Sequence, residues 1–116
     1  PNTDDLRHAP SLRLIDILLD KGARITTYDP IAMDNAKVMY GDRIEFHDDS
    51  YSAMNGADAL IIMTEWNEFR QLDLDKIKEV LAGSIVIDCR NIYKPVIMNG
   101  LGFRYHSFGR PGDADI

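Results

Sequence analysis

The 116-residue sequence lacks the features that mark several common functional classes. Cysteine occurs once, at Cys89, so no disulfide can form within the chain, and a reducing, cytoplasmic compartment is expected. Apolar runs such as ALIIM at 59–63 are far shorter than the roughly 20 residues that a transmembrane helix needs. The sequence contains no G-x-G-x-x-G, Walker A or HExxH motif, and its three histidines are too far apart to suggest a metal site.

Basic residues are also in short supply. Lys and Arg number 13 against 19 Asp and Glu, which gives a net charge of -6. This balance argues against a general nucleic-acid binder and against a protein that binds anionic membranes. It leaves open a local arginine site for a phosphate group.

Helical and strand-like patterns alternate along the chain. Amphipathic spacing predicts helices over 12–21, 31–40, 50–56, 73–81 and, briefly, within 94–102. Apolar or β-branched runs predict strands over 24–30, 43–48, 57–65, 84–89 and 103–108. This alternation favours an α/β domain of the Rossmann-like, doubly wound class, with a mainly parallel sheet and right-handed crossovers.

The opening residues, PNTDDLRHAPS, form a charged turn that leads into the first helix. A doubly wound domain normally begins with a central apolar strand before such a turn. We therefore expect the first strand to lie outside this chain. Its place is expected to be filled by another segment, by a strand from another chain, or by a rearranged sheet, since unpaired backbone inside a sheet is costly.

Three of the predicted strands carry polar groups at their carboxyl ends, at the sheet edge where parallel α/β proteins bind ligands. They are Tyr28-Asp29-Pro30, Thr64-Glu65-Trp66 and Asp88-Cys89-Arg90-Asn91. An arginine between an aspartate and an asparagine can present its guanidinium fork to a phosphate or to ribose hydroxyls. The alternative is that Arg90 forms an ion pair with Asp88 or another acidic residue.

Arg7 presents a similar choice. A cation at the start of a helix is mildly unfavourable, which favours a ligand-binding role for Arg7, whereas Asp4 and Asp5 are better explained as helix-capping residues.

Other candidates have plainer explanations. Cys89 is better explained as a small buried residue than as a nucleophile, and His8, His47 and His106 as residues without catalytic duty. Trp66 and Phe69 either stack on a ligand ring or pack over the end of the sheet.

Five motifs taken in order resemble one family. The segments PNTDDLRHAPS, YDPIA, MTEWNEF and VIDCRNIY, followed by GF.Y.S.GR, are similar to the carboxyl-terminal, UDP-binding domain of the UDP-glucose/GDP-mannose dehydrogenase family, and most similar to its UDP-glucose branch. The resemblance covers residues 1–110, and we expect residues 111–116 to form a loose tail. It implies a parent enzyme that oxidises UDP-glucose to UDP-glucuronate with NAD as cofactor, in polysaccharide biosynthesis.

The resemblance also implies roles for individual residues. Arg90 matches the family arginine that contacts the nucleotide sugar, and Arg7 matches the arginine that contacts NAD. Cys89 does not match the catalytic cysteine, so no catalytic residue and no metal ligand is expected here. The partners implied are UDP-glucose, an amino-terminal Rossmann domain of the parent chain and further copies of a homo-oligomeric parent.

Two other functions stay open on the residues alone. One is a self-contained, non-catalytic α/β nucleotide-binding or regulatory module, which would need no upstream strand. The other is a different α/β enzyme that uses Cys89, for which His106 on the last strand is the available histidine partner.

Overall fold

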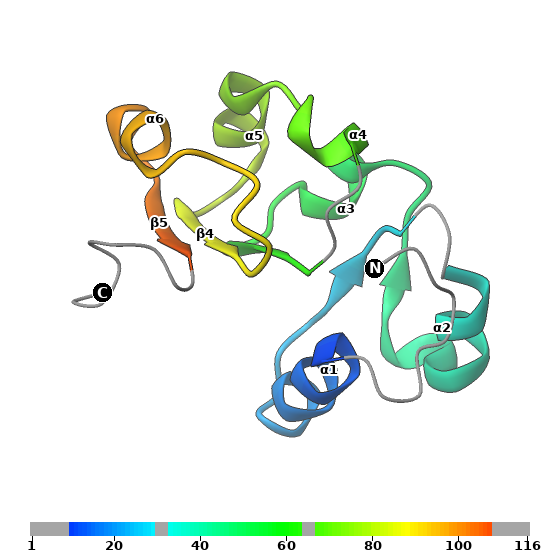
Figure 1. Ribbon diagram of the computed structural model, residues 1–116. Coiled ribbons are helices and arrows are strands. Elements are labelled where there is room, and N and C mark those ends of the chain that lie inside the picture. Colours follow the sequence, from blue (N-terminus) through cyan, green and yellow to red (C-terminus); the bar gives the residue numbers. More distant parts are fainter. Residues whose placement is uncertain (1–9, 30–32, 64–66, 108–116) are drawn as a thin grey trace. The chain divides into compact units, whose positions relative to one another are not determined.

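The computed structural model describes residues 10–29, 33–63 and 67–107, and these fall into two compact units, Pro1–Ala53 and Met54–Ile116. Each unit is considered separately. Within the described ranges no helix has the length and apolarity needed to cross a membrane. Both units alternate helices with strands, as the sequence predicts, and every strand pair in these ranges is parallel (Figure 1).

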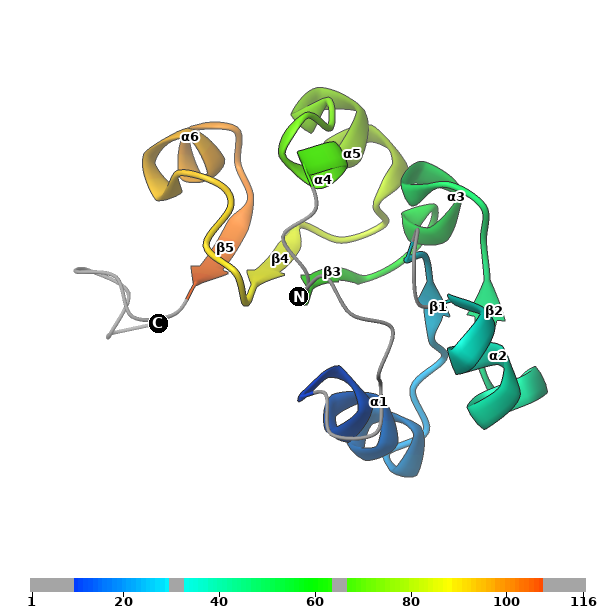
Figure 2. The ribbon, with the colours of Figure 1, turned by 45° about the vertical axis from the view of Figure 1, so that its right-hand side comes forward.

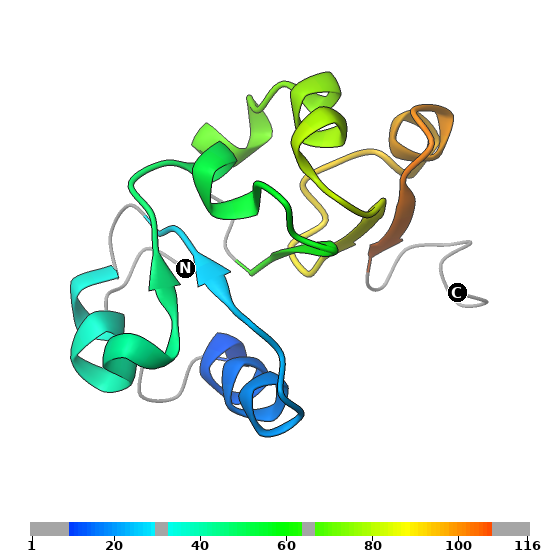
Figure 3. The same cartoon turned by 180° about the vertical axis from the view of Figure 1, so that it is seen from behind.

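The first unit contains a two-stranded parallel sheet. Its elements are α1 (Pro10–Asp20), β1 (Thr26–Thr27), α2 (Met33–Tyr40), the 3-10 turn η1 (Gly41–Arg43), β2 (Glu45–Phe46) and α3 (Ser50–Met54), whose last residue belongs to the second unit. Figure 3 shows β1 and β2 side by side from behind. In the register of this parallel pair, Thr26 is opposite Glu45.

A small core holds the first unit together. Tyr40 and Ile44 are buried, and four half-buried apolar residues pack against them: Ile15, Leu19, Ile25 and Phe46. The Tyr40 hydroxyl donates a hydrogen bond to Asp16 Oδ1 at 3.1 Å and so joins α2 to α1. Burial and the Asp16 carboxylate raise the pKa of the Tyr40 phenol, so it stays a neutral donor at physiological pH.

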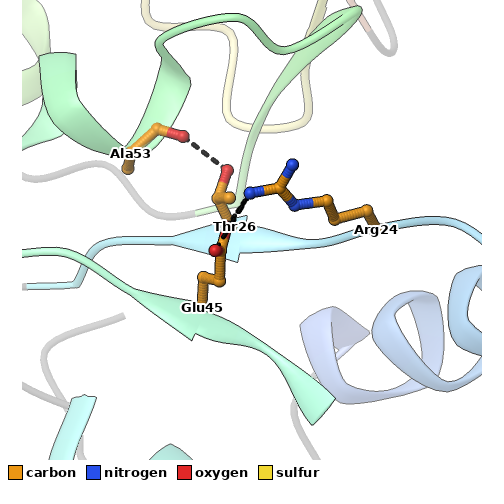
Figure 4. A network of polar contacts seen from close by, with 4 residues as sticks. All are labelled: Arg24, Thr26, Glu45 and Ala53. Atoms are coloured by element: carbon orange, nitrogen blue, oxygen red, sulfur yellow. Dashed lines mark hydrogen bonds and ion pairs between the residues drawn. The ribbon is translucent and has the colours of Figure 1, made fainter. Parts of the chain in front are cut away.

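Polar contacts supplement the short β1–β2 ladder (Figure 4). Thr26 Oγ1 donates to the carbonyl of Ala53 in α3. Arg24 Nη2 lies 2.9 and 2.8 Å from the two carboxylate oxygens of Glu45. Both side chains of this ion pair are largely exposed, so it contributes at most about 1 kcal/mol.

The second unit contains a three-stranded parallel sheet in the order β3-β4-β5. Its elements are β3 (Ala59–Ile62), α4 (Asn67–Arg70), α5 (Leu74–Val80), β4 (Ile85–Asp88), α6 (Pro95–Gly100) and β5 (Arg104–Ser107). Figures 1 and 2 show α4, α5 and α6 on the same side of this sheet.

Burial alternates along β4 and β5, in agreement with that one-sided cover. Val86 and Asp88 of β4 are completely buried, while Ile85 and Ile87 are only half-buried. Tyr105 and Ser107 of β5 are likewise buried. The core of this unit consists mainly of apolar residues from the helices, strands and connecting loops: Met54, Ile62, Phe69, Ile77, Leu81, Val86, Ile92, Tyr93, Met98, Phe103 and Tyr105.

Local sequence signals explain the helix ends. The Asp73 carboxylate caps α5 by accepting from the amides of Asp75 and Lys76 at 3.0 and 3.3 Å. Pro95 begins α6, where its missing amide hydrogen costs nothing. Gly22 follows α1 with φ of +84°, the left-handed conformation that closes many helices.

Three details differ from the sequence predictions. The strands predicted over 24–30 and 43–48 are only two residues long each, Thr26–Thr27 and Glu45–Phe46. The described strands form two sheets rather than one, and β1 and β3 are edge strands. The helix α4 was not predicted, since four residues are too few to show a helical period.

We expect Gly83→Ala to destabilise the second unit. Gly83 lies in the loop between α5 and β4, and a Cβ there would lie 2.3 Å from the backbone oxygen of Asp58, just before β3. Relief of this overlap must move backbone against backbone, so the expected loss is about 1–3 kcal/mol of unfolding free energy. Urea unfolding followed through the amide signals of β3 and β4 measures it.

Gly100→Ala is the matched control for this substitution. Gly100 ends α6, and nothing lies within 4 Å of a Cβ built there. Its unfolding midpoint should stay close to that of the unmodified chain. Equal midpoints for the two variants would show that the Gly83 contact does not constrain the sheet.

Candidate functional site

The candidate site lies at the carboxyl edge of the β3-β4-β5 sheet. Ile62 of β3 is in register with Asp88 of β4, so these parallel strands end at the same edge. The amide of Cys89 donates to Ile62 O at 2.9 Å and extends the ladder to the start of the next loop. The residues that follow β4 are therefore presented where parallel sheets bind ligands.

Asp88 organises this loop from inside the protein. Its side chain is completely buried. Its partners are backbone amides and one hydroxyl rather than a lysine or arginine side chain. Asp88 Oδ1 accepts from the amide of Arg90 at 3.1 Å, and Oδ2 accepts from the amides of Ile92 and Tyr93 at 2.8 and 3.0 Å. A fourth donor, the Tyr105 hydroxyl, lies 2.6 Å from Oδ2. Such convergent donors are what a buried carboxylate requires.

The loop itself has an unusual backbone. Asn91 has φ of 57°, the left-handed region that asparagine tolerates better than most residues with a side chain. Asp88 accepts from residues on both sides of Asn91, so the carboxylate stabilises this turn. Arg90 is exposed, directly before the turn. The arrangement fixes the backbone at Arg90, a residue that is exposed overall.

These contacts bear on the two sequence-based roles of Arg90. The ion-pair alternative named Asp88 as a partner, but the Asp88 oxygens already accept from three backbone amides and a hydroxyl. The role of Asp88 is therefore to shape the loop. The ligand-binding role of Arg90 stays a prediction.

Cys89 is half-buried rather than fully buried, and it lacks the environment of an activated thiol. Burial, and then the nearby Asp88 charge, raise the pKa of the Cys89 thiol, and the Arg90 cation only partly opposes this. His106 is opposite Ile87 in the β4–β5 register, and within the described ranges its Nδ1 is buried with no hydrogen-bond partner. In the described part of the chain no hydrogen bond joins His106 to Cys89. These two residues therefore do not form a pair of nucleophile and general base.

The structure places other predicted residues as follows. Phe69 is buried in α4, which favours packing against the protein over stacking on a ligand ring. His47 follows β2, and its amide donates to Thr27 O at 3.0 Å as part of the first sheet. Several predicted residues lie outside the described ranges: Asp4, Asp5, Arg7, His8, Thr64, Glu65 and Trp66. In the part of the chain that is described, no three potential ligands gather as a metal site would require.

Sequence reasoning missed the contacts of two buried tyrosines in the second unit. Tyr105 contacts Asp88, and the Tyr93 hydroxyl donates to the carbonyl of Phe69 in α4. Alternation along β5 was the available signal for Tyr105, because it lies between the more exposed Arg104 and His106. Nothing in the sequence pairs that hydroxyl with Asp88.

Cys89 should react slowly with iodoacetamide at neutral pH. A raised pKa leaves less thiolate at any pH below it, so alkylation should be slower than for an unperturbed cysteine peptide and should accelerate only in more alkaline solution. Mass spectrometry of the reaction over a range of pH values measures this.

Arg90→Gln provides the internal comparison. The Arg90 cation lowers the pKa of the thiol, so its removal should slow alkylation further. A midpoint below the ordinary cysteine value of about 8.5 would contradict the assignment of Cys89 as an unactivated thiol.

Comparison with known proteins agrees with the motif pattern. A family model described as the UDP-binding domain of the UDP-glucose/GDP-mannose dehydrogenase family matches residues 1–95. A UDP-glucose 6-dehydrogenase from Rhizobium meliloti is 46% identical over 111 residues, and one from Bacillus subtilis is 41% identical over 111 residues. Each alignment covers 96% of this chain, and the chain spans about a quarter of each relative, 25% and 24% respectively.

Solved structures show the same fold. An NDP-N-acetyl-D-galactosaminuronic acid dehydrogenase from Methanosarcina mazei matches 99% of this chain and 23% of its own, with a TM-score of 0.80 and 30% identity. A UDP-glucose dehydrogenase from Pyrobaculum islandicum matches 81% of this chain and 20% of its own, with a TM-score of 0.68 and 32% identity. The Rossmann-like α/β fold expected from the sequence is thereby confirmed, and the chain belongs to the UDP-glucose/GDP-mannose dehydrogenase family, whose UDP-binding domain it matches.

Proposed function

We propose that residues 1–110 are the carboxyl-terminal, UDP-binding domain of an NAD-dependent UDP-glucose 6-dehydrogenase, which oxidises UDP-glucose to UDP-glucuronate. The observation that carries this proposal is the 46% identity to a UDP-glucose 6-dehydrogenase across 96% of the chain. Residues 111–116 are proposed as a tail. The parent is proposed to be a cytoplasmic homo-oligomer that also contains an amino-terminal Rossmann domain.

Arg90 is the proposed contact to the nucleotide sugar. UDP-glucose carries a negatively charged diphosphate, and a guanidinium can form two parallel hydrogen bonds to phosphate oxygens. The Arg90 backbone is held by Asp88 while its side chain is exposed at the sheet edge, which supports this role. The chain has a net charge of -6, so it does not attract a diphosphate as a whole. A cation at that edge of the sheet provides a local attraction.

NAD is proposed to bind mainly to the rest of the parent enzyme, with Arg7 as the contact from this chain. NAD accepts hydride when bound, and its pyrophosphate normally needs a glycine-rich turn before a helix. The described turn between β2 and α3 does not fit, because it carries Asp48 and Asp49. Asp49 accepts instead from the Ser52 amide and hydroxyl, each at 2.8 Å, and so caps α3 internally.

The chemical step is likewise proposed to use residues outside this chain. Cys89, the chain's one cysteine, has a raised thiol pKa, which suits a structural residue better than a nucleophile that must be ionised near neutral pH. The domain then supplies one wall of the substrate site. A length about a quarter of the relatives agrees with this division of roles.

Removal of the Arg90 guanidinium should weaken UDP-glucose binding by about tenfold or more, because charge-assisted hydrogen bonds to phosphate are lost. An NMR titration of the isotope-labelled chain with UDP-glucose should shift signals around residues 88–93, and Arg90→Ala should abolish those shifts. Parallel titration with GDP-mannose tests the preference for the UDP sugar.

Arg104→Ala is the matched control. Arg104 is also exposed and lies on the same sheet, but it begins β5 opposite Ile85, at the amino end of the strands. Its loss should leave the titration unchanged. Equal losses in the two arginine variants would indicate nonspecific charge attraction and would contradict the role of Arg90.

The isolated chain should form no NADH when mixed with UDP-glucose and NAD. The expected absorbance at 340 nm stays at the background level, because the proposed nucleophile and most cofactor contacts belong to the rest of the enzyme. The longer parent enzyme, tested in parallel, should produce NADH. Turnover by the purified 116-residue chain would overturn the proposal and would support a self-sufficient enzyme.

A further inference from the structure

Tyr105 approaches the arginine loop from a strand that does not belong to the loop. It lies on β5, and its hydroxyl is 2.6 Å from Asp88 Oδ2 on β4. Both side chains are buried. In the parallel register Tyr105 is opposite Val86, and Asp88 is two residues further along the same face. That diagonal is about 4.8 Å across the strands and about 6.6 Å along them, a span that a tyrosine ring and hydroxyl can bridge.

The hydroxyl contacts the loop in two ways. Besides the carboxylate, it lies 3.0 Å from the carbonyl oxygen of Tyr93. Asp88 Oδ2 in turn accepts from the amides of Ile92 and Tyr93, and Oδ1 accepts from Arg90. Tyr105 therefore contacts Asp88, whose carboxylate binds the loop amides. It also contacts Tyr93, the last loop residue whose amide Asp88 binds.

We propose that Tyr105 is a positioning residue for Arg90: through Asp88 it keeps the 90–93 backbone in the conformation from which Arg90 binds the nucleotide sugar. This inference rests on the proposed function of Arg90. The physical reason is preorganisation, because a loop ordered before binding does not have to lose that conformational freedom when the ligand arrives. The left-handed Asn91 adds to the need, since an unsupported loop has lower-energy conformations available.

Tyr93 supplies a matched comparison within the same unit. Its hydroxyl is also buried, but it donates to the carbonyl of Phe69 in α4 and not to Asp88. Tyr93→Phe and Tyr105→Phe thus delete the same atom from the same residue type at similar depth. Only Tyr105→Phe removes a donor from the carboxylate that binds the loop amides.

The test combines amide hydrogen exchange with the UDP-glucose titration on the 116-residue chain. Tyr105→Phe should accelerate exchange at the amides of Arg90, Ile92 and Tyr93 by about tenfold, the effect of one lost hydrogen bond to a charged acceptor. The Ala82 amide, which donates to Ala57 O at 2.9 Å in the same unit, is the internal reference and should not change. The Kd for UDP-glucose should rise several-fold. Tyr93→Phe should leave the loop amides and the Kd unchanged.

Each contrary result has a distinct meaning. Unchanged loop exchange in Tyr105→Phe, or faster exchange that includes Ala82 equally, overturns the proposal, because the hydroxyl then has no specific effect on the loop. Faster loop exchange with an unchanged Kd also overturns it and assigns Tyr105 a purely structural role, while Arg90 keeps its proposed function. No binding of UDP-glucose by the unmodified chain or by the longer parent enzyme means that the proposed function fails, and the positioning role fails with it.

Discussion

The second unit depends on one electrostatic constraint, the complete burial of the Asp88 carboxylate. Transfer of an ionised carboxylate from water into a protein core is costly unless several donors replace its hydration. Here three amides and a tyrosine hydroxyl converge on it. Through these contacts one carboxylate joins the loop after β4, with its left-handed turn at Asn91, to the Tyr105 side chain on β5. Arg90 is exposed because the same contacts hold its backbone and leave its side chain at the surface.

Much of this arrangement could be predicted from local sequence signals. Alternating periodicities gave the order of helices and strands, and Pro95 and Asp73 begin or cap helices by rules that involve only their neighbours. The position of Arg90 at a strand end also follows from the chain order alone. The interpretation of Cys89 as an unactivated thiol agrees with the burial that raises its pKa.

The remaining features depend on tertiary contacts that no local pattern encodes. Tyr105 reaches Asp88 only because β4 and β5 pair in one particular register, and a shift by one residue would turn its side chain to the other face. The strand β1 is only two residues long although threonine has a high β-propensity, so propensity does not set its length. The helix α4 is held by packing of Phe69 and by the Tyr93 hydroxyl, not by its own short sequence.

The exclusively parallel pairing of the described strands has a consequence for how the chain folds. Parallel neighbours cannot be joined by a tight hairpin. Thr26 therefore pairs with Glu45, and Ala59 with Ile85, only after the chain between them has closed a long crossover. Contacts between residues far apart in sequence form slowly, because the chain entropy of closing each crossover is lost before the ladder compensates for it. During that interval the apolar segment of β3, Ala59–Ile62, is open to pairing with other chains. The yield of folded protein should therefore depend on concentration during refolding.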